Sequence, residues 1–172
     1  YLPFRVGINV SGRQFVQPDF VDMVCRLLEE TGADPVFLEF EITESVVMKD
    51  VDAAVLTLQA LKKLGINMAI DDFGTGYSSL SCLKHLPLNR LKIDKSFISD
   101  LQDNADDRAI VEATIAMAKR LDLGVTAEGV ETEGQYGFVQ KRECDEVQGF
   151  YFSRPISASE VAETWLIKSP PS

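Results

Sequence analysis

The sequence predicts an α/β protein built on a parallel sheet, and two observations carry this prediction. Short runs of β-branched and aromatic residues alternate with amphipathic helical segments along the chain, which is the pattern of repeated βαβ units. Six such units in 172 residues give about 29 residues each, close to the ~31 of a (β/α)8 barrel of about 250 residues. A barrel lacking two units and a complete open doubly wound sheet of six strands both satisfy this count.

The individual elements follow from local patterns. Proline is favoured in the first helical turn and glycine just after the last, which places helices over 18–32, 52–65 and 106–124, the second capped by Asp52. A final helix begins at Ser157, where Glu160 completes a capping box. In the long helix, the stripe expected to face the core is Ile110, Ala113, Met117 and Leu121. The expected strands are 4–10, 36–42, 66–71, 91–94, 123–128 and 146–151.

The composition excludes several classes of protein. The chain carries 17 Lys and Arg against 27 Asp and Glu, a net charge of −10, and 45% of its residues are hydrophobic. This apolar content suffices for a folded core. The acidic balance argues against a general DNA binder, because such affinity depends on Lys and Arg neutralising phosphates. No run of about 18 apolar residues predicts a membrane span.

The cysteines and the chain ends add three expectations. Cys25, Cys82 and Cys144 lie far apart and form no zinc-type pair, so we expect a reducing, cytoplasmic setting. We expect one domain over 1–168 and a short tail over 169–172, whose Ser-Pro-Pro-Ser sequence is typical of a tail or linker. The chain starts at Tyr1 without a methionine, and we expect it to be a segment of a longer protein.

The second expected strand carries two glutamates on one face. Side chains alternate along a strand, so Glu39 and Glu41 lie opposite the apolar face formed by Leu38, Phe40 and Ile42. One interpretation is an edge strand with a solvated face. The other is that Glu41 points into a cavity at the C-terminal end of the strand, where a cation compensates its charge.

The same pattern recurs on every strand. Adjacent aspartates at 71 and 72 precede a glycine-containing turn, an arrangement that can hold a divalent metal or cap a helix. The C-terminal ends of parallel strands meet at one edge, where active sites form. Carboxylate and amide oxygens suit Mg²⁺ or Mn²⁺, and a carboxylate cluster accepts an anionic phosphodiester only with metal present. The residues at these ends are Asn9, Glu41, Asp71, Asp72, Lys92, Asp94, Glu128 and Gln148.

These residues fall within motifs that occur in a fixed order. The motifs are Asn-Val-Ser (9–11), Glu-Ile-Thr-Glu-Ser (41–45), Asp-Asp-Phe-Gly-Thr-Gly-Tyr-Ser-Ser-Leu (71–80), Leu-Lys-Ile-Asp (91–94), Ala-Glu-Gly-Val-Glu (127–131), Gln-Gly (148–149) and Phe-Ser-Arg-Pro (152–155). With them the whole chain closely resembles the EAL family of cyclic di-GMP phosphodiesterases. The resemblance implies a TIM-like (β/α)8 barrel of the EAL type over 1–168, missing its first two strands. It also implies two Mg²⁺ or Mn²⁺ ions and the opening of cyclic di-GMP to linear pGpG.

The resemblance also implies roles for individual residues. The implied metal ligands are Asn9, Glu41, Asp71, Asp72 and Glu128. The residues implied to handle the attacking water and the phosphate are Lys92, Glu128 and Gln148. The implied loop and supporting residues are Glu44, Phe73, Gly74, Thr75, Gly76, Asp94 and Glu131, and substrate contacts are implied at Gln148, Gly149, Arg154 and Pro155. Lysine is normally protonated, so we expect Lys92 to donate to water or phosphate, and to act as a base only if its pKa is depressed.

One family feature is absent from the sequence. The Glu-Ala-Leu motif, with its metal-binding glutamate and a nearby arginine, would belong to a strand before Tyr1. A gap of two strands exposes sheet edges and favours self-association, and we expect a homodimer. Relatives imply attached sensory or cyclase domains, through which a full-length protein could be membrane-attached. The alternative function is a catalytically inactive cyclic di-GMP receptor, which would be expected to lose some of the strand-end residues.

Overall fold

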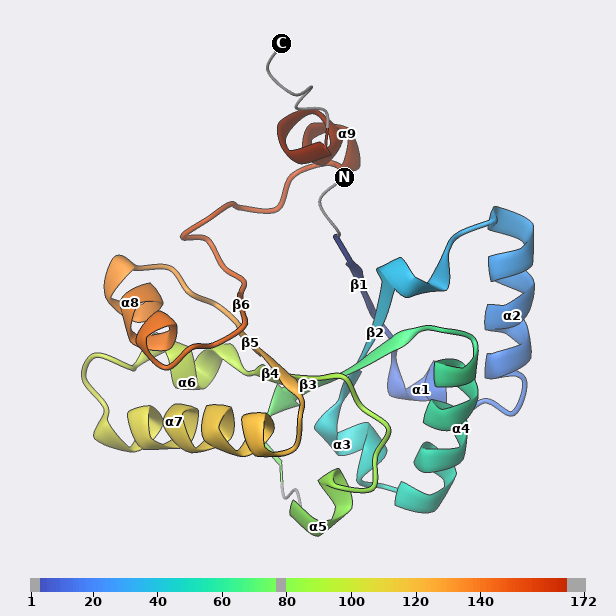
Figure 1. The fold of residues 1–172 in the computed structure, drawn as a ribbon, viewed down its shortest axis with the longest axis horizontal. Helices are drawn as coiled ribbons and strands as arrows, with labels where there is room; N and C mark the ends of the chain where they lie inside the picture. The colour runs from blue at the N-terminus through green and yellow to red at the C-terminus, as the bar shows by residue number, and fades with distance from the viewer. Residues whose placement is uncertain (1–3, 77–79, 167–172) are drawn as a thin grey trace.

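The computed structural model describes residues 4–76 and 80–166, and its sheet runs through the centre of the molecule (Figure 1). The strands are β1 (Val6–Asn9), β2 (Leu38–Thr43), β3 (Asn67–Phe73), β4 (Arg90–Ile93), β5 (Gly124–Ala127) and β6 (Glu146–Val147). All neighbours are parallel, and their order in the sheet is their order in the sequence. A doubly wound sheet would reverse its order at a switch point. The sheet instead curls into a partial barrel, so the barrel prediction is confirmed and the open-sheet alternative is wrong.

The helices lie around this sheet (Figure 1). They are α1 (Gly12–Phe15), α2 (Phe20–Thr31), η1 (Pro35–Phe37), α3 (Glu44–Val47), α4 (Val51–Lys63), α5 (Leu80–Leu83), α6 (Lys95–Ser99), α7 (Ala105–Arg120), α8 (Glu133–Lys141), α9 (Ala158–Val161) and η2 (Ala162–Leu166). Gly32 ends α2 in the left-handed conformation, with φ 67°, and Ser157 begins α9 with the expected capping box. The prediction that Asp52 caps α4 is wrong, because the Asp50 carboxylate accepts the hydrogen bond from Ala53 N.

The core lies between the strands and the long helices. Ile42, Met68, Ile70 and Leu91 are inaccessible to solvent, and burial of an aliphatic side chain of this size contributes about 1.5–3 kcal/mol. The predicted stripe of α7 is off by one position. Its buried residues are Val111, Thr114, Ile115 and Ala118, whereas Ile110 is 38% exposed. The expected tail at 169–172 lies outside the described residues, as do Tyr77, Ser78 and Ser79 of the long motif.

Ion pairs fill the N-terminal end of the curled sheet. The guanidinium of Arg90 donates to Glu39 Oε2 at 3.2 Å and to Glu146 Oε1 at 2.8 Å. Arg90 and Glu39 are each only 6% exposed. The edge interpretation of β2 is therefore wrong: the strand lies between β1 and β3, and its glutamates face the barrel interior.

The partial barrel has an open side between β1 and β6. Each of these strands has one neighbour in the described sheet, and Phe4, Val6 and Ile8 are exposed along the β1 edge. Arg5 bridges the opening with Nη2 2.5 Å from Glu146 Oε1. Helix α9 projects from the body of the molecule (Figure 1). Within the described residues, no helix combines the length and the apolarity that crossing a membrane requires.

Candidate metal centre and active site

Four charged side chains meet at the C-terminal ends of the strands. Lys92 Nζ lies 2.5 Å from Glu41 Oε2, 2.7 Å from Glu128 Oε1 and 3.1 Å from Asp71 Oδ1. The Lys92 side chain is only 4% exposed, and the three carboxylates are 11–17% exposed. One buried ammonium thus holds together carboxylates from β2, β3 and the end of β5.

Strand alternation explains why these groups share one interior. Glu41 follows Glu39 by two residues and Lys92 follows Arg90 by two, so each pair projects from the same side of its strand. The ion pairs of Arg90 therefore form one layer and those of Lys92 a second layer above it. Gly7 leaves room for this second layer, because a Cβ there would lie 2.2 Å from Glu41 Oε1. The pairing of β1 with β2 sets Asn9 beside Glu41.

Asp71 and Asp72 both reach the site because β3 is irregular there. The pairing register with β4 shifts between Ile70 and Phe73, and Asp72 has a φ of 53°. A bulge of this kind changes the direction of one side chain relative to its neighbour. Carboxylate oxygens of Asp71, Asp72 and Glu128 consequently lie within 4.8 Å of one another.

The pKa values of these groups reflect burial in a charged environment. Burial raises the pKa of Glu128 to about 7; the hydrogen bond and the charge of Lys92 oppose the shift, and Asp71 adds to it. Burial alone would lower the pKa of Lys92, but hydrogen bonds from its ammonium to Glu128 and Glu41 outweigh this effect, so the pKa is raised. Burial and the charges of Asp71 and Asp94 raise the pKa of Asp72. Lys92 is therefore protonated, and the surplus negative charge favours protons or cations.

The turn after β3 is fixed by a buried carboxylate. Glu44 Oε2 accepts a hydrogen bond from Gly74 N at 2.9 Å, and Glu44 is 1% exposed. Gly76 leaves room for the other oxygen, since a Cβ there would lie 2.6 Å from Glu44 Oε1. Thr75 Oγ1 closes the turn by donating to Asp72 O at 2.8 Å, and Phe73 is buried just before it. The turn is thereby held directly beside the carboxylate cluster.

Asp94 and Glu131 lie around the cluster rather than within it. Asp94 caps α6 by accepting from Ser96 N at 2.9 Å. Burial alone would raise the pKa of Asp94, but the hydrogen bonds from Ser96 outweigh burial and lower it. Glu131 is exposed and follows β5 at the mouth of the site.

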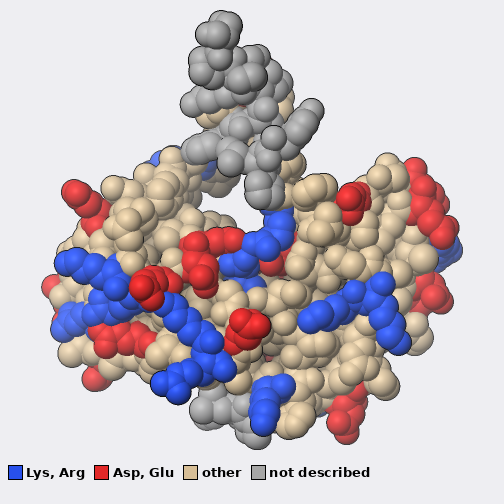
Figure 2. Space-filling model, in the orientation of Figure 1, with Lys and Arg blue, Asp and Glu red and all other residues tan. Residues whose placement is uncertain are grey.

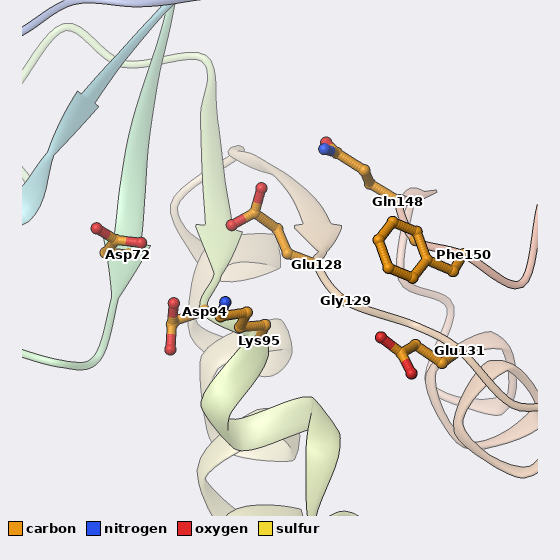
Figure 3. Close-up of a pocket in the computed structure, with 9 residues that line it drawn as sticks. Asp72, Asp94, Lys95, Glu128, Gly129, Glu131, Gln148 and Phe150 are labelled. Carbon is orange, nitrogen blue, oxygen red and sulfur yellow. The ribbon is translucent and has the colours of Figure 1, made fainter. Parts of the chain in front are cut away.

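A cavity of about 390 Å³ opens beside the cluster (Figure 3). Asp72, Asp94 and Lys95 lie on one side of it and Gln148 and Phe150 on the other, with Glu128 between them (Figure 3). Its lining residues are Asp72, Asp94, Lys95, Glu128, Gly129, Glu131, Gln148, Gly149 and Phe150. This volume falls within the range of small-molecule sites.

The strand-end loops shape the far side of this cavity. Strand β6 ends at Val147, earlier than expected, so Gln148 belongs to the following loop. A Cβ at Gly149 would lie 2.1 Å from Val130 O, so only glycine allows the two loops to approach this closely. Arg154 and Pro155 do not line the cavity; the Arg154 guanidinium instead lies 4.7 Å from the centre of the Phe150 ring. Lys95, Gly129 and Phe150 were not predicted to belong to the site.

Two other features bear on where a ligand could bind. A second cavity of about 660 Å³ lies at the opposite ends of the strands, lined by Phe4, Arg5, Val36, Phe37, Asn67 and Glu146. It is larger, yet the three-carboxylate group lies at the other end of the barrel. On the face drawn in Figure 2, Lys and Arg form short groups interleaved with Asp and Glu.

The donor set of the cluster fits a hard divalent cation. Asp71, Asp72 and Glu128 offer only oxygen atoms, which is the ligand type that Mg²⁺ and Mn²⁺ prefer. Glu41 pairs with the same lysine. A bound cation would oppose both causes of the raised pKa of Glu128, which are burial first and the charge of Asp71 second. The residues present therefore fit a metal centre.

Comparisons with known proteins agree with this geometry. The model of the family described as EAL domain matches residues 2–155. The chain is 44% identical over 92% of its length to the cyclic di-GMP phosphodiesterase NbdA of Pseudomonas aeruginosa. It is 43% identical over 92% of its length to the bifunctional diguanylate cyclase/cyclic di-GMP phosphodiesterase MucR of the same organism. The chain spans only 20% and 23% of these two proteins.

Solved structures share the same architecture. The PaMucR phosphodiesterase in its c-di-GMP complex superposes with a TM-score of 0.89 and 43% identity, covering 91% of this chain and 64% of that one. The EAL domain of Mycobacterium smegmatis DcpA gives a TM-score of 0.86 and 45% identity, covering 92% and 71%.

Proposed function

The chain belongs to the EAL domain family, and from this premise we propose that it hydrolyses cyclic di-GMP to linear pGpG in bacterial second-messenger signalling. One observation carries the proposal: Asp71, Asp72 and Glu128 converge beside Lys92 at the cavity. Carboxylates that can hold metal ions beside a protonated lysine are groups suited to phosphodiester hydrolysis. The chain is also similar to a protein named as a cyclic di-GMP phosphodiesterase.

Two Mg²⁺ or Mn²⁺ ions form part of the proposal. The residues that would hold them lie within two residues of the C-terminal end of a strand at this edge. They are Asn9, Glu41, Asp71, Asp72 and Glu128. When bound, such ions supply Lewis acidity at the phosphoryl oxygens and make water more acidic.

The protein's own residues then carry the proton and orient the phosphate. Hydrolysis adds a water oxygen to phosphorus and breaks one bond from phosphorus to a ribose oxygen, which leaves with a proton. Glu128 accepts the water proton, because a carboxylate beside the attacking water can act as a general base. Lys92 stays protonated and donates to the water or the phosphate. Gln148, across the cavity from Asp72 (Figure 3), orients the same groups.

The remaining predicted residues support or contact the substrate in this proposal. Glu44 holds the turn formed by Phe73, Gly74, Thr75 and Gly76 against the cluster. Asp94 fixes the start of α6, and Glu131 supports the site from the mouth of the cavity. Substrate contacts are proposed at Gln148, Gly149, Arg154 and Pro155, of which the first two line the cavity.

The proposal extends to the setting of the domain. A homodimer is supported by the exposed apolar residues on the β1 edge. Attached sensory or cyclase domains are supported by relatives of which this chain spans about a fifth. A cytoplasmic setting is supported by three free cysteines, Cys25, Cys82 and Cys144, and no membrane span is proposed for the domain over 1–168.

The alternative is a receptor that binds cyclic di-GMP without cleaving it, and the open side of the partial barrel favours it. The test is to incubate the protein with cyclic di-GMP, with and without Mn²⁺ or Mg²⁺, and to follow binding and product together. Metal-dependent pGpG supports the enzyme. Binding without product under both metals supports the receptor, and folded protein that neither binds nor cleaves contradicts both.

A further inference from the structure

The cavity beside the cluster is lined by an excess of acidic groups, whose negative charge repels a phosphodiester ligand. Four of its lining residues are carboxylic acids, namely Asp72, Asp94, Glu128 and Glu131, and one is a cation, Lys95. A cyclic dinucleotide carries two phosphodiesters, each with one negative charge. Metal held by the cluster can compensate the phosphate that reacts, but the second phosphate needs positive charge elsewhere in the cavity.

Lys92 is in no position to supply that charge. Its ammonium is surrounded by Glu41, Asp71 and Glu128 at 2.5–3.1 Å, and its side chain is 4% exposed. Lys95, by contrast, is exposed at the first residue of α6. In the part of the chain that the structure describes, its ammonium forms no ion pair, although Asp94 precedes it in sequence.

The stem of Lys95 is held at the rim by the loop after β5. Gly129 has a φ of 69°, and a Cβ at that position would lie 2.6 Å from Lys95 Cβ and 3.3 Å from Lys95 Cα. The glycine therefore lets the backbone of the loop rest against the lysine. Both residues line the cavity, and Lys95 lies on the side opposite Gln148 and Phe150 (Figure 3).

We propose that Lys95 is a substrate-positioning residue that binds the second, non-reacting phosphate of the cyclic dinucleotide. This inference rests on the proposed function and adds to it a specific recognition contact. A lysine suits the task because its ammonium is a compact point charge on a flexible stem, able to follow a phosphate that is not itself held by metal.

The test compares Lys95→Ala, Lys95→Arg and the control Lys62→Ala, which removes an exposed lysine near the end of α4. With cyclic di-GMP and Mn²⁺, we expect Lys95→Ala to raise KM at least tenfold while kcat changes less than threefold. Lys95→Arg should recover most of the affinity, and Lys62→Ala should match the unmodified protein. Thermal unfolding of each variant establishes that the fold is retained.

A substrate with a single phosphate tests whether Lys95 acts at the reacting phosphate or at the non-reacting one. Hydrolysis of bis(4-nitrophenyl) phosphate should differ less than twofold between the unmodified protein and Lys95→Ala, because this substrate has no second phosphate to lose. An unchanged KM for cyclic di-GMP would overturn the inference. So would a loss in kcat that arginine fails to restore, since the lysine would then act at the reacting phosphate.

The outcomes also separate this inference from the proposed function. If the unmodified protein cleaves cyclic di-GMP and Lys95→Ala does so with the same KM, only the role of Lys95 fails. If the unmodified protein neither binds nor cleaves it, the proposed function fails and this inference falls with it.

Discussion

Lys92 Nζ lies 2.7 Å from Glu128 Oε1, and the two side chains extend from neighbouring strand ends into the same buried space. This contact sets the charge state of both groups. The lysine is held protonated by its carboxylate partners, while burial and the nearby Asp71 raise the pKa of Glu128 despite the lysine. Loss of either partner therefore alters both the stability of the metal-free protein and its chemistry.

We expect Lys92→Ala to reduce turnover of cyclic di-GMP at least 100-fold, the scale typical of losing one positioned hydrogen-bond donor from an active site. Removing one partner of a buried ion pair lowers the free energy of unfolding by about 3–5 kcal/mol. The metal-free variant should therefore also unfold at a lower urea concentration. Mn²⁺ should restore more stability to this variant than to the unmodified protein, because the cation replaces the lost ammonium.

The measurements are initial rates and urea unfolding with and without Mn²⁺. Lys119→Ala serves as the control, because it removes a surface ion pair with Glu143 far from the site and should leave rates and metal response unchanged. Full turnover in Lys92→Ala would refute its assigned role.

Metal binding should stabilise the protein through the carboxylate cluster. At a free Mn²⁺ concentration 100 times the Kd, linkage contributes about 2.7 kcal/mol, or roughly 5–10 °C in Tm for a domain of this size. Asp71→Asn should abolish most of this shift, because it removes charge from the three-carboxylate group. Differential scanning calorimetry with EDTA as reference measures it.

The matched control for the metal experiment is Asp103→Asn. This aspartate is exposed in the turn before α7 and lies outside the cluster. A Tm shift that survives in Asp71→Asn, or is lost in Asp103→Asn, would place the metal elsewhere.

Gly149 should be far less tolerant of alanine than Gly137. A Cβ at Gly149 would meet the backbone oxygen of Val130 at 2.1 Å, and overpacking of this kind typically costs about 1–3 kcal/mol. Gly137 lies inside α8 with no atom within 4 Å of an added Cβ, so alanine there should stabilise by about 0.5–1 kcal/mol. Guanidinium unfolding of both variants checks the opposite signs.

Cys144 should resist alkylation at neutral pH. Burial raises the pKa of its thiol to about 11, and the Sγ donates to Val125 O. The reactive thiolate is therefore scarce at pH 8 and increases as the pH rises toward 11. Mass spectrometry of iodoacetamide-treated native protein should show labelling of Cys144 that is slow at pH 8 and faster at pH 10. Rapid labelling of Cys144 in folded protein at pH 8 would contradict the buried environment.

The strands, and the edge of the sheet where polar residues gather, could be predicted from the sequence. The prediction used the alternation of side chains along strands and the residues that begin and end helices. Both signals come from residues that are close together in the sequence. Because the strands of the sheet are parallel, their C-terminal ends then meet at one edge. Two limits of the prediction come from features that local rules do not encode. Apolar residues occupy adjacent positions on α7, so Ile110 and Val111 could equally have faced the core, and only packing against the sheet selects Val111.

The second limit concerns the residues around the cluster. Strand alternation sends Asp71 and Asp72 to opposite faces, and only the shift in pairing near Ile70 brings both to the carboxylate cluster. Lys95 and Gly129 meet through a close backbone approach between two loops, which no sequence periodicity reports. The polar residues at the strand ends predicted the cluster, and the resemblance assigned roles to them, but neither predicted that Lys95 and Gly129 belong to the site.

The two interior layers differ in how their charges balance, and this difference predicts an order of events. Around Arg90, two arginines face two glutamates. Around Lys92, three carboxylates share one lysine, and a fourth carboxylate, that of Asp72, lies beside them. The excess negative charge around Lys92 makes the electrostatic potential at the mouth of the barrel negative, so this end attracts small cations and repels anions. We therefore expect ordered loading, in which metal arrives first and rapidly, at a rate that falls with ionic strength. The dinucleotide should follow only after the potential at the mouth has changed sign.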